Sequence, residues 1–291
     1  MILFMNLNAA LKNKNDFMKL LSEADIATLT LVLSQLTNDL KYVDRIKPYV
    51  KGAFDYSVKM PEDLALEIKH ELMHVLENKF IKNNNLNNYF NLNNKNIKDL
   101  MSVGVGEEVP NEYIPMMKEE LAIDGNNLRD LNIERLKNKN TDNISVIIIG
   151  AGLCGILAGI KLLQANISFK IIEKNDSVGG TWYENSYPGC GVDTPNHVYA
   201  YSFEPSFQWQ EFYSKRDSIY EYLKSCVDKY GLYKHIEFNT SVEKIIFNQI
   251  NNKWETHLVK NKKSQIMQSS LIISAVGQLN NPALPKIKGI E

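Results

Sequence analysis

The chain has 291 residues, of which 44% are hydrophobic, and a formal net charge of −1. This length allows one or two domains with a substantial core. A near-zero net charge provides no overall field that would attract nucleic acid or an anionic membrane, and no apolar run is long enough to span a bilayer. We therefore expect no nucleic-acid partner and no membrane. The three cysteines are widely spaced without a CxxC pair, which predicts a reduced, cytoplasmic setting.

Residues 1–140 have apolar side chains at helical spacing and little strand pattern. A helix is predicted to begin at Pro61, because proline suits the first turn and two acidic residues follow at the positive end of the helix dipole. The Asn-rich run 83–96 predicts a loop, and Pro115 predicts a short helix that continues to Leu121. We expect a small, mostly α-helical domain whose apolar surface joins copies of the chain into a homo-oligomer. The apolar positions of the predicted helices are Leu20, Leu21, Ile26, Leu29, Leu31, Leu33 and Leu36, followed by Leu64, Ile68, Leu72, Val75 and Leu76.

One motif in this region matches HExxH, the pattern of zinc metalloproteases. His70-Glu71-Leu72-Met73-His74 places two imidazoles one helical turn apart. A third ligand is missing, because the next histidine is His197 and no acidic residue follows on the same helix at the spacing that these enzymes use. We interpret the motif as a coincidence on a solvated helix face and predict no metal site.

The most informative stretch begins with residues 144–149, a nearly continuous β-branched run that is typical of a central parallel strand. Gly150, Gly152 and Gly155 follow at the spacing of the dinucleotide-binding fingerprint, and a helical pattern comes next. In that fingerprint the first glycine makes the tight turn, the second lets the backbone approach a pyrophosphate, and the third lets the helix pack closely on the strand. The free N–H groups at the start of the helix suit phosphate.

A second apolar strand, residues 169–172, ends on an acidic residue, Glu173. A carboxylate at this place can accept hydrogen bonds from the two ribose hydroxyls of a dinucleotide. A Gly-Gly turn then follows within a few residues, in the sequence Gly179-Gly180-Thr181-Trp182. NAD-linked domains do not need this second turn, whereas many FAD-binding domains have it. The sequence therefore predicts that the dinucleotide is FAD.

After four more residues the chain reads Tyr187-Pro188-Gly189, and after three more Asp193. The combined string, from Gly-Gly-Thr-Trp to this aspartate, resembles a fingerprint of type I Baeyer–Villiger monooxygenases. The resemblance implies a flavoprotein monooxygenase that uses FAD, NADPH and O₂ to convert a small-molecule ketone into an ester. It also implies that Asp193 lies beside the flavin as a catalytic residue. The further FAD-binding residues that we expect, beyond the three fingerprint glycines and Glu173, are Lys174, Gly180, Thr181, Trp182, Asp193, Tyr199, Val242, Ala275 and Gly277.

The remaining sequence predicts the rest of the same domain. Residues 216–230 have helical periodicity and end at Gly231, which suits the C-terminal cap. Four short runs alternate like antiparallel strands, at residues 236–238, 242–247, 254–259 and 265–268, with a turn at 251–252. A parallel strand is expected at residues 271–275. The fold class is thus α/β, with a Rossmann-like FAD-binding domain at 141–291 (a parallel sheet plus an antiparallel β insertion), preceded by the helical domain at 1–140.

A narrower resemblance lies in residues 103–113, which are similar to the end of the N-terminal extension of 4-hydroxyacetophenone monooxygenases. We expect the chain to be the N-terminal part of such an enzyme, with an incomplete FAD domain, because the family's second fingerprint, its second glycine-rich motif for NADPH and its active-site arginine do not occur in the sequence. Two alternatives stay open: a flavin-containing monooxygenase that oxidises nitrogen or sulfur, and an inactive FAD-binding fragment.

Overall fold

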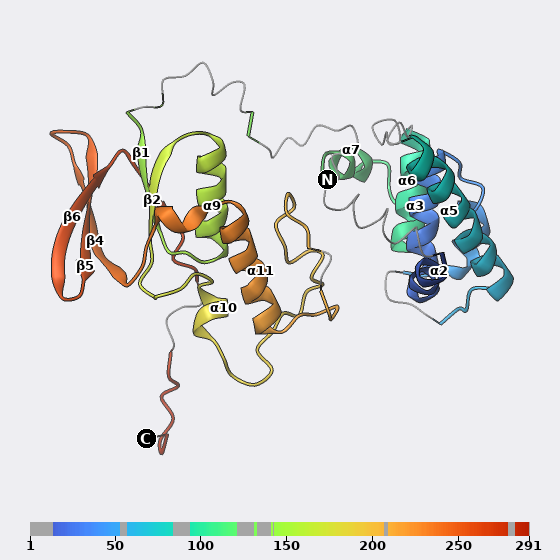
Figure 1. Cartoon of the computed structure of the whole chain (residues 1–291). Coiled ribbons are helices and arrows are strands. Elements are labelled where there is room, and N and C mark those ends of the chain that lie inside the picture. The colour runs from blue at the N-terminus through green and yellow to red at the C-terminus, as the bar shows by residue number, and fades with distance from the viewer. Residues whose placement is uncertain are drawn as a thin grey trace. The chain divides into compact units, whose positions relative to one another are not determined.

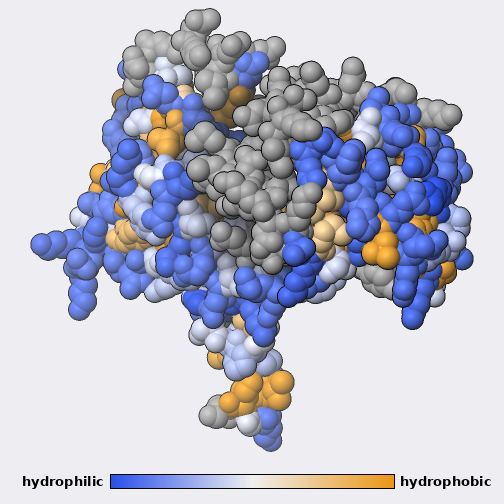
Figure 2. Space-filling view, turned by 45° about the vertical axis from the view of Figure 1, so that its right-hand side comes forward, coloured by the Kyte–Doolittle hydropathy of each residue, from blue (hydrophilic) through white to orange (hydrophobic). Residues whose placement is uncertain are grey.

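The structure is a computed structural model that describes residues 14–52, 57–83, 94–120, 131–132, 141, 143–206, 209–278 and 283–290. The chain forms two compact units, Met1–Asp130 and Leu131–Glu291. Figure 2 shows a surface that is mostly hydrophilic, with hydrophobic side chains scattered over it. None of the helices in the described ranges combines the length and the apolar character that crossing a bilayer requires.

Every regular element in the described part of the first unit is helical, as predicted. The start of α3 shows the local cause: Asp25 precedes the helix, and its carboxylate accepts a hydrogen bond from the Thr28 N–H at 2.7 Å. This cap satisfies a backbone group that the helix leaves free. The elements are α2 (Lys14–Glu23), α3 (Ile26–Thr37), α4 (Val43–Ile46), the 3-10 helix η1 (Lys47–Tyr49), α5 (Glu62–Asn83), α6 (Asn94–Val105) and α7 (Tyr113–Glu120).

The helix predicted after Pro61 is confirmed as α5, and its predicted apolar stripe is buried in the core of the unit. Two predicted boundaries are wrong. The loop at 83–96 is shorter, because α5 includes Asn83 and α6 begins at Asn94; residues 84–93 lie outside the described residues. The short helix starts two residues before Pro115, since proline is tolerated throughout the first turn. One predicted apolar position, Leu20, is 59% exposed.

An ion pair joins two helices of this unit on its surface. Arg45 donates two hydrogen bonds to the Glu67 carboxylate, at 2.8 and 2.7 Å, and the Tyr42 hydroxyl donates a third at 3.1 Å. These partners lower the pKa of Glu67 to about 2, with the Arg45 hydrogen bonds as the largest cause. The charged carboxylate therefore favours the folded state above its ordinary pKa of 4.5, and this contribution is lost as the pH falls towards 2.

We expect Glu67→Gln to make the stability of the first unit depend less on pH in the acid range. Between pH 4.5 and about 2 the wild-type unfolding midpoint should fall further than that of the variant. Circular dichroism follows both units, while the three tryptophans, Trp182, Trp209 and Trp254, all report on the second unit, so the difference isolates the first. Glu71→Gln, at an exposed site on the same helix, is the control, and an identical pH dependence in all three proteins would contradict the assignment.

The second unit is built on a parallel sheet in the order β3-β2-β1-β7. Val146 and Ile148 point to one face of the sheet and Ile147 to the other, because side chains alternate along a strand, and all three are buried. Such a strand needs cover on both faces. The strands are β1 (Ser145–Ile149), β2 (Ser168–Ile172), β3 (Ile236–Glu237) and β7 (Leu271–Ser274).

Helices cover one face of this sheet and a second, antiparallel sheet covers the other (Figure 1). The helical layer consists of α9 (Leu153–Gln164) and α11 (Arg216–Lys229), and Gly231 follows the latter with φ +64°, as its predicted capping role requires. The second sheet is the meander of β4 (Thr240–Asn248), β5 (Lys253–Lys260) and β6 (Lys263–Ser269). Its Leu258 packs with Ile147 and Ile172 of the parallel sheet.

This arrangement confirms the predicted α/β fold with a Rossmann-like parallel sheet and an antiparallel insertion. The predicted return strand is β7, which pairs in parallel with β1. One strand prediction is wrong: Ile236 and Glu237 do not join the antiparallel sheet but pair in parallel with Ile171 and Ile172 at the edge of the main sheet. Two residues are too short a run for alternation to reveal which sheet they enter.

Candidate functional site

A cavity of about 940 Å³ lies at the carboxyl ends of β1, β2 and β7. In open α/β sheets this end is where ligands bind, because the loops that leave the strands diverge there. Most of the predicted site residues come together around this cavity, although they are spread over more than 120 positions of the chain. They are Gly150, Gly152, Glu173, Lys174, Gly180, Thr181, Trp182, Tyr199, Val242, Ala275 and Gly277.

The turn after β1 and the first turn of α9 each require a glycine, for different reasons. Gly150 has φ +97°, and its N–H donates to the Ile172 carbonyl at 2.8 Å, which ties the turn to β2. A β-carbon at Gly155 would lie 1.9 Å from the Gly150 carbonyl oxygen. Gly155 does not line the cavity but lets α9 approach the turn, which is the packing role expected for the third glycine of the fingerprint.

The backbones of Gly152 and Gly180 face each other across the cavity wall. A β-carbon on Gly152 would lie 3.5 Å from the Gly180 Cα, and one on Gly180 would lie 3.0 Å from the Gly152 Cα. The bare backbone leaves a cradle at the N-terminus of α9, where free N–H groups and the positive end of the helix dipole meet. This cradle fits a pyrophosphate.

Glu173 is a buried carboxylate, only 3% exposed, at the end of β2. It accepts hydrogen bonds from the Ala151 N–H at 2.7 Å and from the Asn175 N–H at 2.9 Å. The first of these bonds connects the carboxylate to the glycine turn itself. Glu173 therefore lies between the turn and the cavity, where it can accept hydrogen bonds from ribose hydroxyls.

Glu184 lines the same cavity and was missed in the sequence analysis. It belongs to the short helix α10 (Thr181–Glu184) that follows the Gly-Gly turn. Its Oε1 accepts hydrogen bonds from Lys174 Nζ and Asn175 Nδ2, both at 2.8 Å. Burial opposes its ionisation, but these two donors lower its pKa below the ordinary value. The only sequence signal was an acidic residue one helical turn after the two glycines.

Two aromatic side chains form another part of the wall. The Trp182 indole N–H donates to the Tyr199 hydroxyl at 3.1 Å, and the two rings meet edge to face with centroids 5.6 Å apart. The pair connects the Gly-Gly turn to the aromatic loop that follows residue 193. An apolar wall of this kind suits a planar ring system.

A buried aromatic cluster lies behind this loop and against α9 and α11. The Tyr201 hydroxyl donates to the Leu153 carbonyl in the first turn of α9 at 2.6 Å, and the Tyr201 N–H donates to the Tyr222 hydroxyl at 2.9 Å. Burial raises the pKa of Tyr201 and of Tyr222 well above that of an exposed tyrosine. Both phenols therefore keep their protons and remain hydrogen-bond donors at neutral pH.

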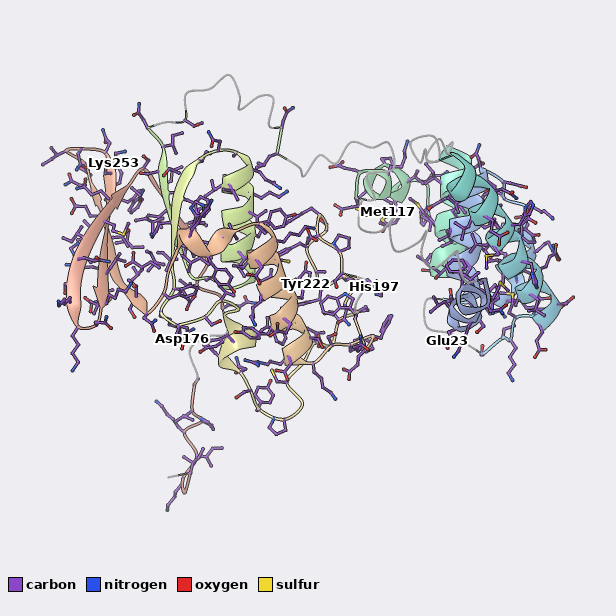
Figure 3. The ribbon with its side chains drawn as sticks, in the orientation of Figure 1. Glu23, Met117, Asp176, His197, Tyr222 and Lys253 are labelled. Carbon is purple, nitrogen blue, oxygen red and sulfur yellow. The ribbon has the colours of Figure 1, made fainter. Side chains whose placement is uncertain are left out.

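Asp193, the expected catalytic residue, is exposed and does not line the cavity. Its loop is fixed by the buried Asn196, whose amide bonds the Ser214 hydroxyl at 2.7 Å and whose side-chain oxygen accepts the Ser214 N–H at 2.9 Å. His197 is exposed beside Phe212 and lies on the side of α11 away from the parallel sheet (Figure 3). A role for Asp193 beside a flavin stays a prediction.

The HExxH histidines lie on α5 in the first unit, and both are exposed. Within the described residues no three histidine, cysteine or acidic side chains gather where they would hold a metal ion.

Comparison with known proteins agrees with this geometry. Residues 148–216 match the family model of the NAD(P)-binding Rossmann-like domain. The chain is 34% identical over 151 residues to a Baeyer–Villiger monooxygenase of Streptomyces coelicolor, an alignment that covers 52% of this chain and 28% of the relative. It is 32% identical over 152 residues to 2-oxo-Δ³-4,5,5-trimethylcyclopentenylacetyl-CoA monooxygenase of Pseudomonas putida, covering 51% and 27%. Its relatives are monooxygenases.

The chain spans less than a third of the length of these relatives. Among solved structures, it is similar to OTEMO in complex with FAD and NADP, with a TM-score of 0.47 and 32% identity over 50% of this chain and 28% of that one. None of these matches bears on the narrower resemblance to 4-hydroxyacetophenone monooxygenases.

Proposed function

We propose that the cavity binds FAD and that the chain is the flavin-binding part of an NADPH-dependent monooxygenase that converts ketones into esters. The observation that carries the proposal is the joint placement of Gly152, Glu173 and Gly180 around one cavity. A single-phosphate ligand has no use for a buried carboxylate beside a pyrophosphate cradle, whereas a dinucleotide uses both. The names of the relatives supply the reaction class.

Different residues around the cavity would bind different parts of FAD. Gly150, Gly152 and the first turn of α9 would bind the pyrophosphate, and Glu173 would accept the hydroxyls of the adenosine ribose. The Trp182–Tyr199 wall would pack against a ring and exclude water on that side. The bound flavin supplies the redox chemistry, while these residues bind and orient it. We assign no residue of this chain to NADPH.

The proposal also gives roles to Asp193 and to the first unit. We infer that the Asp193 carboxylate approaches the cofactor in the working enzyme and acts on it electrostatically. Residues 141–291 would form the FAD domain, and residues 1–140 would join copies of the chain. The resemblance of segment 103–113 to the N-terminal extension of 4-hydroxyacetophenone monooxygenases supports the narrower family assignment and makes 4-hydroxyacetophenone the first ketone to test.

The protein purified from its own organism tests the function. Heat denaturation should release FAD and not FMN, which chromatography of the supernatant distinguishes. With NADPH, ¹⁸O₂ and 4-hydroxyacetophenone, mass spectrometry should detect the acetate ester with one ¹⁸O atom. Release of FMN, or an ester without the label, would refute the proposal; an N-oxide or S-oxide formed from amine or sulfide, with no ester from ketones, would favour the alternative reaction class.

A further inference from the structure

A buried tyrosine, Tyr201, bonds the first turn of α9 on the side away from the cavity. The Tyr201 hydroxyl donates to the Leu153 carbonyl at 2.6 Å. Leu153 lines the cavity, whereas Tyr201 is 5% exposed and is not among the residues that line it. Tyr201 thus contacts the cavity wall without reaching the ligand space.

Tyr201 is itself held firmly. Its N–H donates to the Tyr222 hydroxyl at 2.9 Å, and that hydroxyl donates to the Glu204 carbonyl at 2.8 Å. Its ring stacks on Phe203 with centroids 5.3 Å apart and planes only 10° from parallel. Since Tyr222 belongs to α11, these contacts fix the first turn of α9 relative to the second helix of the layer.

We propose that Tyr201 is a positioning residue that holds the N-terminal turn of α9 in the orientation in which its N–H groups bind the pyrophosphate. The inference rests on the proposed function, in which the cavity takes FAD. Helix ends lack part of their hydrogen bonding and open more easily than helix interiors. A buried donor bonded to a carbonyl of the first turn opposes this opening, so the N–H groups are already aligned when the ligand arrives.

The substitution Tyr201→Phe removes the donor and keeps the stacked ring. We expect it to raise the Kd for FAD about three- to tenfold, the effect of one lost hydrogen bond. Tyr230→Phe is the matched control. The Tyr230 ring meets Phe203 edge to face in the same cluster, but its hydroxyl donates to Glu204 Oε2 at 2.8 Å and not to a carbonyl of α9. Its Kd should stay within about twofold of the wild-type value. Fluorescence titration of the 291-residue chain with FAD measures all three.

Hydrogen–deuterium exchange of the FAD-free chain gives a second readout that needs no ligand. The amides of residues 156–158, which donate to the carbonyls of the first turn, should exchange faster in Tyr201→Phe and at the wild-type rate in Tyr230→Phe. An unchanged Kd in Tyr201→Phe, equal weakening in both variants, or unchanged exchange at these amides would overturn the inference. If the wild-type chain bound no FAD, the proposed function would fail, and the exchange data would still decide whether Tyr201 holds the turn.

Discussion

Gly152→Val should weaken FAD binding by at least about 100-fold, because each lost hydrogen bond to a charged phosphate costs about 1.5–3 kcal/mol and more than one would be lost. Gly152 has φ −79° and ψ −170°, which valine adopts without strain, so the backbone does not oppose the change. The effect comes from space: a β-carbon on Gly152 would already lie 3.5 Å from the Gly180 Cα, and the two further methyl groups of valine would reach into the space where we place the pyrophosphate. Fluorescence titration with FAD measures the loss.

Gly152→Ala should have a smaller effect on FAD binding, because its single β-carbon would lie at an ordinary contact distance of 3.5 Å from the Gly180 Cα. We expect about a tenfold loss for alanine, corresponding to about 1.4 kcal/mol, with little change in unfolding midpoint for either variant. If the Gly152→Val variant bound FAD as tightly as the wild type, the pyrophosphate would not lie in this cradle. A large drop in the unfolding midpoint of the valine variant would instead assign Gly152 to packing.

Gly155→Ala should destabilise the second unit by about 3 kcal/mol, at the upper end for overpacked sites. The new β-carbon would lie 1.9 Å from the Gly150 carbonyl oxygen, and a backbone atom cannot move aside without shifting α9 or the turn. Urea unfolding followed by tryptophan fluorescence measures this unit alone, because all three tryptophans belong to it.

Gly159→Ala, one turn along the same helix, is the matched control. Its β-carbon would meet the tips of two flexible side chains, Ile171 at 3.0 Å and Phe169 at 3.3 Å. Replacing glycine inside a helix also gains about 1 kcal/mol, which offsets the crowding, so we expect a net change within about 1 kcal/mol. Similar losses in the two variants would contradict the view that Gly155 serves the approach of the helix to the turn.

The parts of the site that the sequence predicts are those encoded by contiguous residues. The strand, glycine turn and helix from 144 to 164 are specified locally, and Glu173 follows at the end of the next strand, so their arrangement follows from one βαβ unit. The Gly-Gly turn is bonded to the same unit by the Gly179 N–H, which donates to the Ala151 carbonyl at 2.9 Å. Motif and geometry therefore agree here.

The parts that the sequence does not predict depend on distant partners. Ile236 and Glu237 enter the parallel sheet because β2 offers a free edge, and nothing within the two residues signals this. Glu184 lines the cavity and meets Lys174 only once the fold brings α10 to the end of β2. Tyr201 looks like an ordinary core aromatic until the fold brings its hydroxyl to Leu153, 48 positions earlier in the chain. No local pattern reports such contacts.

The central claim, that the cavity with Glu173 is a site for FAD, is tested most directly by competition. The 291-residue chain is titrated with FAD alone and again in the presence of an equal concentration of NADPH. We predict one FAD per chain and an unchanged titration with NADPH, because a 2′-phosphate would meet the buried Glu173 carboxylate and be repelled. Displacement of FAD by NADPH, or the absence of saturable FAD binding, would contradict the claim.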